Sequence, residues 1–390
     1  MLFARFAESL AAIARENRTR SLETNQAPQG VEIDIDNRRL LNFCSNDYLG
    51  LANHPVLIDA LQEGAHRYGV GAGAAALLSG YSEAHQELAE GLARVTKRER
   101  ALIFSSGYMA NLGVLSGLVA SDEQVLSDQL NHASLIDGVR LSKAENVRYA
   151  HGDMLELEAA LVATAPTRTW VVTDGLFSMD GDFAPLPTIA ALAKRHEAIV
   201  VCDDAHGFGV FGGGAGTVAH FKLQEADVPL LVVTFGKALG TVGAAVLGPA
   251  VLIESLLQNA RTFIYDTAPS PAMSYATSRA LRLVTEDASF RERLFSNLRY
   301  FRAALNATGI PVPRGEGPIQ ILLIGDGATA LRVAAGLREK GLYVRAIRPP
   351  TVPKDTARLR ICISAAHQQQ HLDRLVEGLA GYRDQFRPLV

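Results

Sequence analysis

Short apolar runs alternate with longer amphipathic stretches between residues 101 and 247, and this alternation is the strongest constraint on the fold. The runs are Ala101–Phe104, Gln124–Ser127, Val147–Tyr149, Thr169–Thr173, Ile199–Cys202, Leu230–Val233 and Gly243–Leu247. Such alternation predicts an α/β sheet, mostly parallel, with helices on both faces. Most of the runs are nearly continuous in apolar residues, as expected of strands that are buried on both sides.

The segments that flank this sheet have their own patterns. Residues 1–25 predict a helix, and Val31–Ile35 with Leu40–Phe43 predict a small hairpin around a turn at Asp36-Asn37. Further helices are predicted over Pro55–Tyr68, Glu83–Thr96 and residues 270–305. Beyond residue 310, strands (Ile319–Ile324, Tyr343–Ile347, Arg358–Ile363) alternate with helices (Thr329–Lys340, Gln368–Phe386). The sequence therefore predicts an N-terminal helix and hairpin segment (1–50), a large α/β domain (51–285) and a smaller C-terminal α/β domain (286–390).

Composition limits the classes of function. The chain has 390 residues, of which 48% are hydrophobic and 20% charged, as is ordinary for a globular protein. A net charge of −3 does not favour nucleic acid or an anionic membrane as a partner. No apolar run reaches the roughly 18 to 20 residues of a membrane span, and the N-terminus lacks a signal-peptide core. Three widely spaced cysteines indicate a reducing compartment, so we expect a cytoplasmic protein with no zinc site.

Two of the predicted strands end next to residues with distinctive chemistry. Lys237 follows Leu230–Val233, while Asp203 and His206 follow Ile199–Cys202. Ligands of open α/β sheets bind outside the carboxyl ends of the strands. A lysine amine can form a Schiff base with an aldehyde cofactor, and an acid can keep that cofactor's ring nitrogen protonated. Together these residues predict a site for pyridoxal 5'-phosphate (PLP), with Lys237 and Asp203 as catalytic residues.

Other strand ends supply further cofactor contacts. Gly107 and Tyr108 open a helix whose free amides suit a phosphate group, and Thr234 could hydrogen-bond the same phosphate. His206 could bond the phenolic oxygen of the cofactor, and His132 could stack on its ring. For His132 the alternative is a half-buried histidine with a structural role.

Three conspicuous motifs have weaker implications. The acids of Asp174–Asp182 lack the closing glutamate of a calcium loop, so we predict no metal site there. Gly212–Gly216 lacks the strand–turn–helix order of a dinucleotide loop and is predicted to be a surface turn. Arg348 precedes two prolines and could clamp a substrate carboxylate, although a rigid turn between domains fits equally well.

With these residues in place, the chain resembles the α-oxoamine synthases, which are fold-type I PLP-dependent transferases that join an amino acid to an acyl-CoA with loss of carbon dioxide. The matching motifs are Leu41–Leu51, Ser79–Ser82, Asn131–Leu135, Phe177–Asp182, Asp203–Gly207 and Thr234–Lys237. The resemblance implies a homodimer with active sites at the interface. The stretch Ala346–Pro353 favours the biotin-pathway branch of the family.

The resemblance also implies roles for individual residues. Lys237 would carry the Schiff base and move the proton at the substrate α-carbon, and Ser178 would help to hold the cofactor. Thr267 would reach the cofactor of the partner subunit. On the substrate side the implied residues are Asn46, Arg348 and Thr351, with Arg20 near the acyl-CoA entrance. Two places depart from the family pattern: Gly71–Leu78 has no polar side chain, and Asp266 replaces a hydroxyl near the phosphate, from which we expect it to point away.

The activity implied by this branch is the decarboxylative condensation of L-alanine with pimeloyl-CoA, or with a pimeloyl-carrier protein, to give 8-amino-7-oxononanoate. A condensation of glycine with acetyl-CoA remains open, because one methyl group in a pocket is worth only about 1–3 kcal/mol. An aminotransferase is a further alternative. A PLP-binding regulator would need a basic DNA-binding segment, which this sequence lacks.

Overall fold

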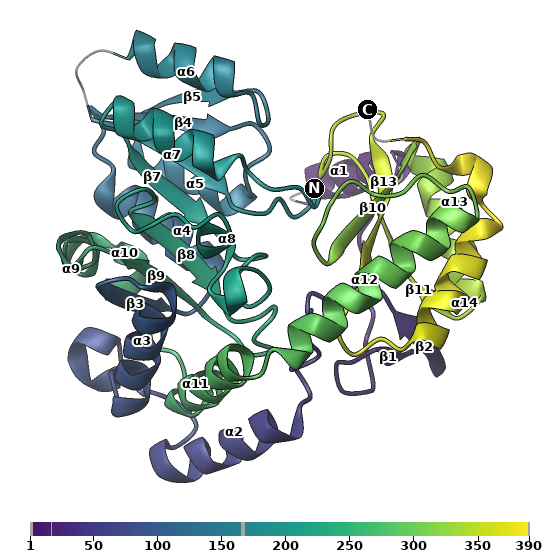
Figure 1. The fold of residues 1–390 in the computed structure, drawn as a ribbon, viewed down its shortest axis with the longest axis horizontal. Coiled ribbons are helices and arrows are strands. Elements are labelled where there is room, and N and C mark those ends of the chain that lie inside the picture. Colours follow the sequence, from purple (N-terminus) through teal and green to yellow (C-terminus); the bar gives the residue numbers. More distant parts are fainter. Residues whose placement is uncertain (1–2, 17, 165–167, 389–390) are drawn as a thin grey trace. The chain divides into compact units, whose positions relative to one another are not determined.

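A computed structural model describes residues 3–16, 18–164 and 168–388, and internal contacts divide the chain into two compact units (Figure 1). One unit combines Met1–Ser45 with Ser296–Val390, and the other is Asn46–Phe295. The N-terminal segment is thus built into the same unit as the C-terminal segment. The predicted division at residues 50 and 285 stays a prediction.

A seven-stranded sheet forms the centre of the unit Asn46–Phe295, with strand order β3-β9-β8-β7-β6-β4-β5. The strands are β3 (Arg100–Phe104), β4 (Gln124–Asp128), β5 (Glu145–Tyr149), β6 (Thr169–Asp174), β7 (Ile199–Asp203), β8 (Leu230–Thr234) and β9 (Ala244–Gly248). Neighbouring strands from β5 to β8 are parallel, and β9 is antiparallel to both β8 and β3. Each predicted apolar run overlaps one of these strands, which confirms the mostly parallel α/β sheet.

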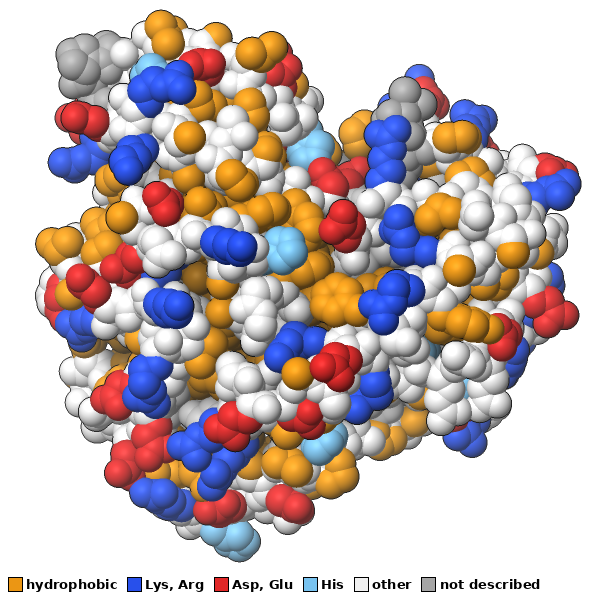
Figure 2. Space-filling model, viewed as in Figure 1, with side chains coloured by type: hydrophobic (Ala, Val, Ile, Leu, Met, Phe, Trp, Pro, Cys, Tyr) orange, Lys and Arg blue, Asp and Glu red, His pale blue; other side chains and the backbone are white. Residues whose placement is uncertain are grey.

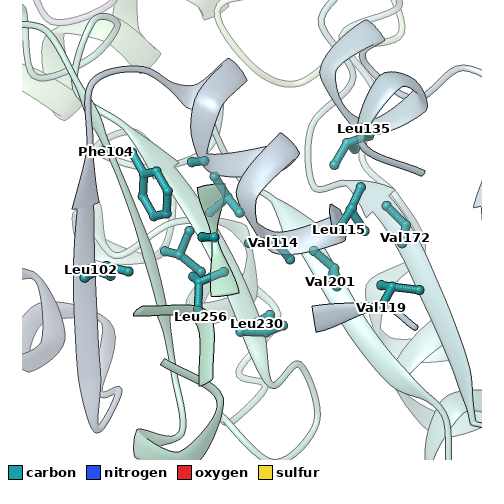
Figure 3. Packing of buried hydrophobic residues seen from close by; sticks show 14 of the residues in the cluster. Leu102, Phe104, Val114, Leu115, Val119, Leu135, Val172, Val201, Leu230 and Leu256 are labelled. Atoms are coloured by element: carbon teal, nitrogen blue, oxygen red, sulfur yellow. The ribbon is translucent and has the colours of Figure 1, made fainter. Parts of the chain in front are cut away.

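Helices surround this sheet because its strands are apolar on both sides. The helices of this unit are α2 (Pro55–Tyr68), α3 (Glu83–Thr96), α4 (Gly107–Leu118), α5 (Ala133–Ser142), α6 (Met154–Ala163), α7 (Leu186–Arg195), α8 (Thr217–His220), α9 (Ala250–Asn259), α10 (Arg261–Ile264) and α11 (Pro271–Glu286), with short helical turns at Ala76–Gly80 and Gly212–Gly214. Val114 and Leu115 of α4 pack among Phe104, Val201 and Leu230 of the strands (Figure 3). Each such side chain contributes roughly 1.5–3 kcal/mol through burial, so α4 is firmly held on the sheet.

Two three-stranded sheets form the other unit. One has the order β1-β2-β11 and the other β10-β13-β12. The elements are α1 (Ala4–Arg15), β1 (Glu32–Ile35), β2 (Arg38–Asn42), β10 (Ile319–Gly325), α13 (Gly327–Glu339), β11 (Leu342–Tyr343), β12 (Arg345–Ile347), β13 (Ala357–Cys362), α14 (Gln369–Ala380) and a helical turn at Arg383–Gln385; α12 (Ser289–Ala307) spans the boundary between the units. β1 and β2 form the predicted hairpin, with Asp36 and Asn37 at positive φ in its turn.

Four predicted elements differ from the structure, and one of them is the last helix, which ends at Ala380 instead of Phe386. The N-terminal helix ends at Arg15 instead of residue 25, since Thr19 and Ser21 disfavour helix and α1 buries no side chain that would extend it. The helix predicted over 270–305 is two helices, because Asp287 accepts a hydrogen bond from the Ser289 backbone N–H (2.8 Å) and turns the chain. The strand predicted over Tyr343–Ile347 is split between β11 and β12, which belong to different sheets.

On the face drawn in Figure 2, Lys and Arg side chains are interspersed with Asp and Glu. Among the residues that the structure describes, no helix is long and apolar enough to cross a membrane.

Candidate active site

Lys237 lies in the turn that follows β8. Its Nζ donates a hydrogen bond to Thr234 Oγ1 (3.3 Å), at the last position of the strand. The Gly240 backbone N–H donates to the Lys237 carbonyl (2.9 Å) and closes the turn. The amine is therefore held at the carboxyl edge of the sheet, where the strand pattern predicted it.

Asp203 ends the neighbouring strand β7 and is only 4% exposed. Its Oδ1 accepts a hydrogen bond from the Ala205 N–H (3.0 Å), and its Oδ2 accepts one from Asn111 Nδ2 (2.6 Å). Within the described ranges, no Lys, Arg or His nitrogen lies within 4.0 Å of this carboxylate. A buried carboxylate without a cation is costly, so a protonated ring nitrogen is the partner that this position lacks.

A second buried acid, Asp174, ends β6 directly beside Asp203 in the strand register. Its Oδ2 accepts a hydrogen bond from the His132 backbone N–H (2.8 Å). Burial raises the pKa of Asp174 well above its usual range, and the nearby charge of Asp203 raises it further. Of these two acids, Asp174 is therefore the one whose pKa is raised by burial and by its neighbour's charge.

His132 caps the start of α5 and is linked to Asp203 through two side chains. His132 Nδ1 lies 2.7 Å from Ser134 Oγ, and Asn111 Nδ2 donates to both Ser134 Oγ (2.9 Å) and Asp203 Oδ2. Burial lowers the pKa of His132, as does the positive charge of Lys237, while Asp203 opposes them. A neutral, oriented imidazole suits stacking on a flat ring. Sequence reasoning did not assign a role to Asn111, whose position one helical turn after Gly107 was the available signal.

His206 belongs to a hydrogen-bond chain that begins at Asn46. The Tyr48 hydroxyl lies 2.7 Å from His206 Nδ1 and donates to Asn46 Oδ1 (3.2 Å). A residue predicted for the substrate and one predicted for the cofactor are thus joined through Tyr48, which sequence reasoning did not single out.

The start of α4 lies against Thr234 at the predicted phosphate end. A Cβ on Gly107 would come within 2.5 Å of Thr234 Cγ2, so only glycine allows this approach. Ser106 caps the helix by accepting a hydrogen bond from the Met109 N–H (3.2 Å). The backbone N–H groups of Gly107 and Tyr108, also in the first turn, are then available to an anion. The ring of Tyr108 lies 6.3 Å from that of His132, and its hydroxyl donates to Asp137.

Asp266 faces the turn that precedes α4. Its Oδ2 accepts a hydrogen bond from Ser105 Oγ (2.6 Å), and Ser105 directly precedes the helix cap. The expectation that Asp266 points away from the phosphate stays a prediction, because the contact that the structure shows is with Ser105 of its own chain. Thr267, the next residue, is exposed and forms an isolated β-bridge with Ala75 of the glycine-rich connection. Its reach to a partner subunit stays a prediction.

His151 supports the loop that carries Ser178. Its two ring nitrogens lie 2.9 Å from Asp128 Oδ1 and 2.9 Å from Asp182 Oδ2. Burial lowers the pKa of His151, but hydrogen bonds and charges of the two acids outweigh burial and raise the pKa to about 10. His151 therefore carries a positive charge that joins the end of β4 to the Ser178 loop. The role of Ser178 itself stays a prediction.

The remaining predicted substrate residues lie together in the unit formed by the two chain ends. Arg20, Arg348 and Thr351 line one pocket of about 460 Å³ with Arg18 and Arg345. Arg348 donates a hydrogen bond to the Thr19 carbonyl (3.4 Å), and Arg345 is paired with Glu23. This arginine-rich pocket suits carboxylate or phosphate groups.

Known proteins are similar to this sequence over nearly its whole length. A family profile described as aminotransferase class I and II matches residues 38–379. An 8-amino-7-oxononanoate synthase from Methylococcus capsulatus is 51% identical, over 96% of this chain and 97% of the relative. Another, from Nitrosococcus oceani, is 50% identical over 94% of this chain and 98% of the relative. The chain belongs to the 8-amino-7-oxononanoate synthase family.

A solved structure agrees with this membership. Serine palmitoyltransferase from S. paucimobilis, solved with PLP-linked myriocin bound, superimposes with a TM-score of 0.91 at 29% identity, over 97% of this chain and 96% of that chain. The resemblance to α-oxoamine synthases and the fold-type I architecture are thereby confirmed. In this chain, Lys237, Asp203, His206 and His132 lie at one edge of the large sheet.

Proposed function

We propose that this protein condenses L-alanine with a pimeloyl thioester and releases 8-amino-7-oxononanoate, carbon dioxide and the free thiol carrier, as a step of biotin biosynthesis. The observation that carries the proposal is the pair of Lys237 and the cation-free buried Asp203 on adjacent strands of a chain about half identical to 8-amino-7-oxononanoate synthases. PLP is the cofactor, and when bound it supplies an electron sink for negative charge at the amino-acid α-carbon.

The residues of the site divide the tasks of this reaction among them. Lys237 anchors the cofactor and then moves the proton at the α-carbon of L-alanine. Asp203, fixed by Asn111 and the Ala205 N–H, keeps the ring nitrogen protonated. His132 covers the ring, while Thr234 and the first turn of α4 bind the phosphate. The residues present therefore fit PLP from its phosphate to its ring nitrogen.

The substrate side divides between amino acid and acyl donor. Asn46, oriented by Tyr48, and Arg348 bind the carboxylate of L-alanine, and Arg20 and Thr351 contact the acyl thioester. The α-carbon forms a bond to the thioester carbonyl carbon as the thiol leaves. The carboxylate of the former alanine then departs as carbon dioxide, and the α-carbon takes a proton.

The proposal includes a homodimer in the cytoplasm. Exposed Thr267, next to the glycine-rich connection, reaches the cofactor of the partner subunit. In the part of the chain that the structure describes, Cys44, Cys202 and Cys362 belong to no disulfide, which supports a reducing compartment.

The test is release of free thiol by PLP-loaded protein, measured with L-alanine or glycine combined with pimeloyl-CoA or acetyl-CoA. We expect release with L-alanine and pimeloyl-CoA, and none from a Lys237→Ala variant. Release only with glycine and acetyl-CoA would keep the site and replace the substrates. If no pair releases thiol while an amino acid alone converts the cofactor to its amine form, the protein is an aminotransferase instead.

A further inference from the structure

A second cavity lies in the unit Asn46–Phe295, and none of the proposed active-site residues lines it. Its volume is about 480 Å³, within the range of small-molecule sites. Its wall combines the end of α3, the turn at Gly212–Gly214, and α8 with the loop that follows it.

Arg98 gives this cavity a buried positive charge. The residue is 6% exposed, and its guanidinium donates to the backbone carbonyls of Val228 and Pro229. Its Nε has no hydrogen-bond partner, and in the described part of the chain no carboxylate oxygen lies within 4.0 Å of its nitrogens. The charges of Glu225, Asp204 and Asp227 act on Arg98 without pairing with it directly, so an anion in the cavity would add a closer negative charge.

Two lysines line the same cavity. Lys97 follows the last residue of α3, Lys222 follows α8, and both side chains are exposed. Among residues 3–16, 18–164 and 168–388, neither ammonium group has a hydrogen bond or an ion pair. One acid, Glu225, also lines the cavity, and its carboxylate accepts a hydrogen bond from the Glu99 N–H (3.1 Å). Three cations against one acid leave the cavity positive.

The glycine turn and the apolar residues shape the rest of the wall. Gly212 and Gly213 have φ values of 58° and 70°, and a Cβ on Gly213 would meet nothing within 4 Å. The backbone therefore borders open space without a side chain, so a ligand can approach it closely. Val95, Val218 and Leu223 supply apolar surface beside the cations.

We propose that this cavity binds a small phosphorylated metabolite, with its phosphate group between Lys97, Lys222 and Arg98 and its body along the apolar side chains. The glycine turn that the sequence suggested to be a mere surface turn is then part of a binding site. This site is independent of the condensation reaction proposed above.

Binding is tested by calorimetry on PLP-loaded protein at low salt, with AMP and inorganic phosphate as probes. Loading with PLP fills the cofactor's own phosphate site. The test variant is Lys97→Gln with Lys222→Gln. The matched control is Lys143→Gln with Lys194→Gln, which removes the same charge from exposed lysines of the same unit that do not line the cavity. Lys143, like Lys97, follows a helix at positive φ.

We expect saturable AMP binding that weakens at least about tenfold in the test variant and less than about twofold in the control. Tighter binding of AMP than of inorganic phosphate supports a phosphorylated metabolite, whereas equal binding would replace it with free phosphate as the ligand. If both double variants bind AMP as tightly as the unmodified protein, the proposal is overturned and the AMP is assigned to the basic pocket around Arg348. No binding by either probe, or equal losses in both variants, overturns the site.

Discussion

At the residue scale, function depends on which of two adjacent buried acids carries the charge. Asp174 and Asp203 are paired in register at the ends of β6 and β7. Two neighbouring carboxylates cannot both ionise cheaply, and burial raises the pKa of Asp174 well above its usual range. Asp203, which accepts two hydrogen bonds, is the carboxylate that we propose for the ring nitrogen.

Replacing Asp203 with Asn should slow removal of the α-proton by at least about 10²-fold, because a neutral amide cannot keep the ring nitrogen protonated. Asp174→Asn is the matched control and should lose less than about tenfold, since burial raises the pKa of this carboxyl group and no ring nitrogen is assigned to it. The measurement is exchange of the L-alanine α-proton in heavy water, followed by NMR. Equal losses in both variants would show that the charge is not on Asp203.

The close approach of α4 to β8 predicts a second pair of variants. Gly107→Ala places a methyl group within 2.5 Å of Thr234 Cγ2, so the start of the helix must shift and PLP should dissociate about tenfold more readily. Adding Thr234→Ser removes that methyl contact and should restore most of the affinity. Equilibrium dialysis of PLP measures both, with Thr234→Ser alone as control. A double variant as weak as Gly107→Ala would contradict the steric explanation.

The principal site residues could be predicted because a short apolar run shows in the sequence where a buried strand ends. Asp203 ends β7, Lys237 and His206 follow strands by three residues, and all three lie at the predicted edge of the sheet. Their hydrogen-bond partners could not be predicted, because they are distant in the sequence. Asn111 is 92 residues from Asp203, and Tyr48 is 158 residues from His206. Such pairs depend on how α4 and the N-terminal loop pack, which no local pattern encodes.

At the scale of elements, local sequence patterns predict where helices and strands occur better than they predict which strands pair. The helices predicted at Pro55–Tyr68 and Glu83–Thr96 coincide with α2 and α3, because helix periodicity and caps are local. The apolar run Tyr343–Ile347 could not reveal that β11 pairs with β2 while β12 pairs with β13. The choice of partner is a tertiary property.

The link made by His151 between the end of β4 and the Ser178 loop should make stability depend on pH. The folded-state pKa of about 10 lies above the ordinary value of about 6.5. The stabilisation is therefore full below about pH 6.5 and is lost as pH rises through 10. At pH 7, His151→Gln should lower the free energy of unfolding by about 1–3 kcal/mol, and the deficit should shrink toward pH 10.

Urea unfolding of both proteins at pH 7 and pH 10 measures this effect. Exposed His66 in α2 provides the control, as His66→Gln should leave stability unchanged at both values. A deficit for His151→Gln that stays constant between the two values would mean that packing against Phe177, not charge, is what His151 contributes.

At the scale of the whole molecule, the alternation of runs was enough to predict the α/β class, but not the grouping of the chain ends. Met1–Ser45 belongs with Ser296–Val390 because β2 pairs with β11 and Phe43 stacks on His367. Composition does not change between these segments in a way that would reveal the pairing. Assembly of two copies is likewise inferred from the family.

Subunit mixing tests the shared site. Lys237→Ala and Thr267→Trp should each be inactive, the second because a bulky side chain blocks the partner's cofactor. If subunits exchange at random, about a quarter of the sites then combine an intact Lys237 with an intact Thr267, so activity should return to about that level. Mixing Lys237→Ala with Asp203→Asn is the control and should restore nothing, since both changes fall on one subunit's half of the site. If the mixture of Lys237→Ala and Thr267→Trp shows no activity, Thr267 does not belong to the partner's active site.

The pairing of β2 with β11 has a consequence for how the chain is made. β2 leaves the ribosome early, but its partner strand follows about 300 residues later, which at ordinary rates of translation is roughly 15 to 60 seconds. A lone β1–β2 hairpin is barely stable, and its open edge can pair with other nascent chains. We therefore expect the first 45 residues to need shielding by a chaperone until synthesis is nearly complete.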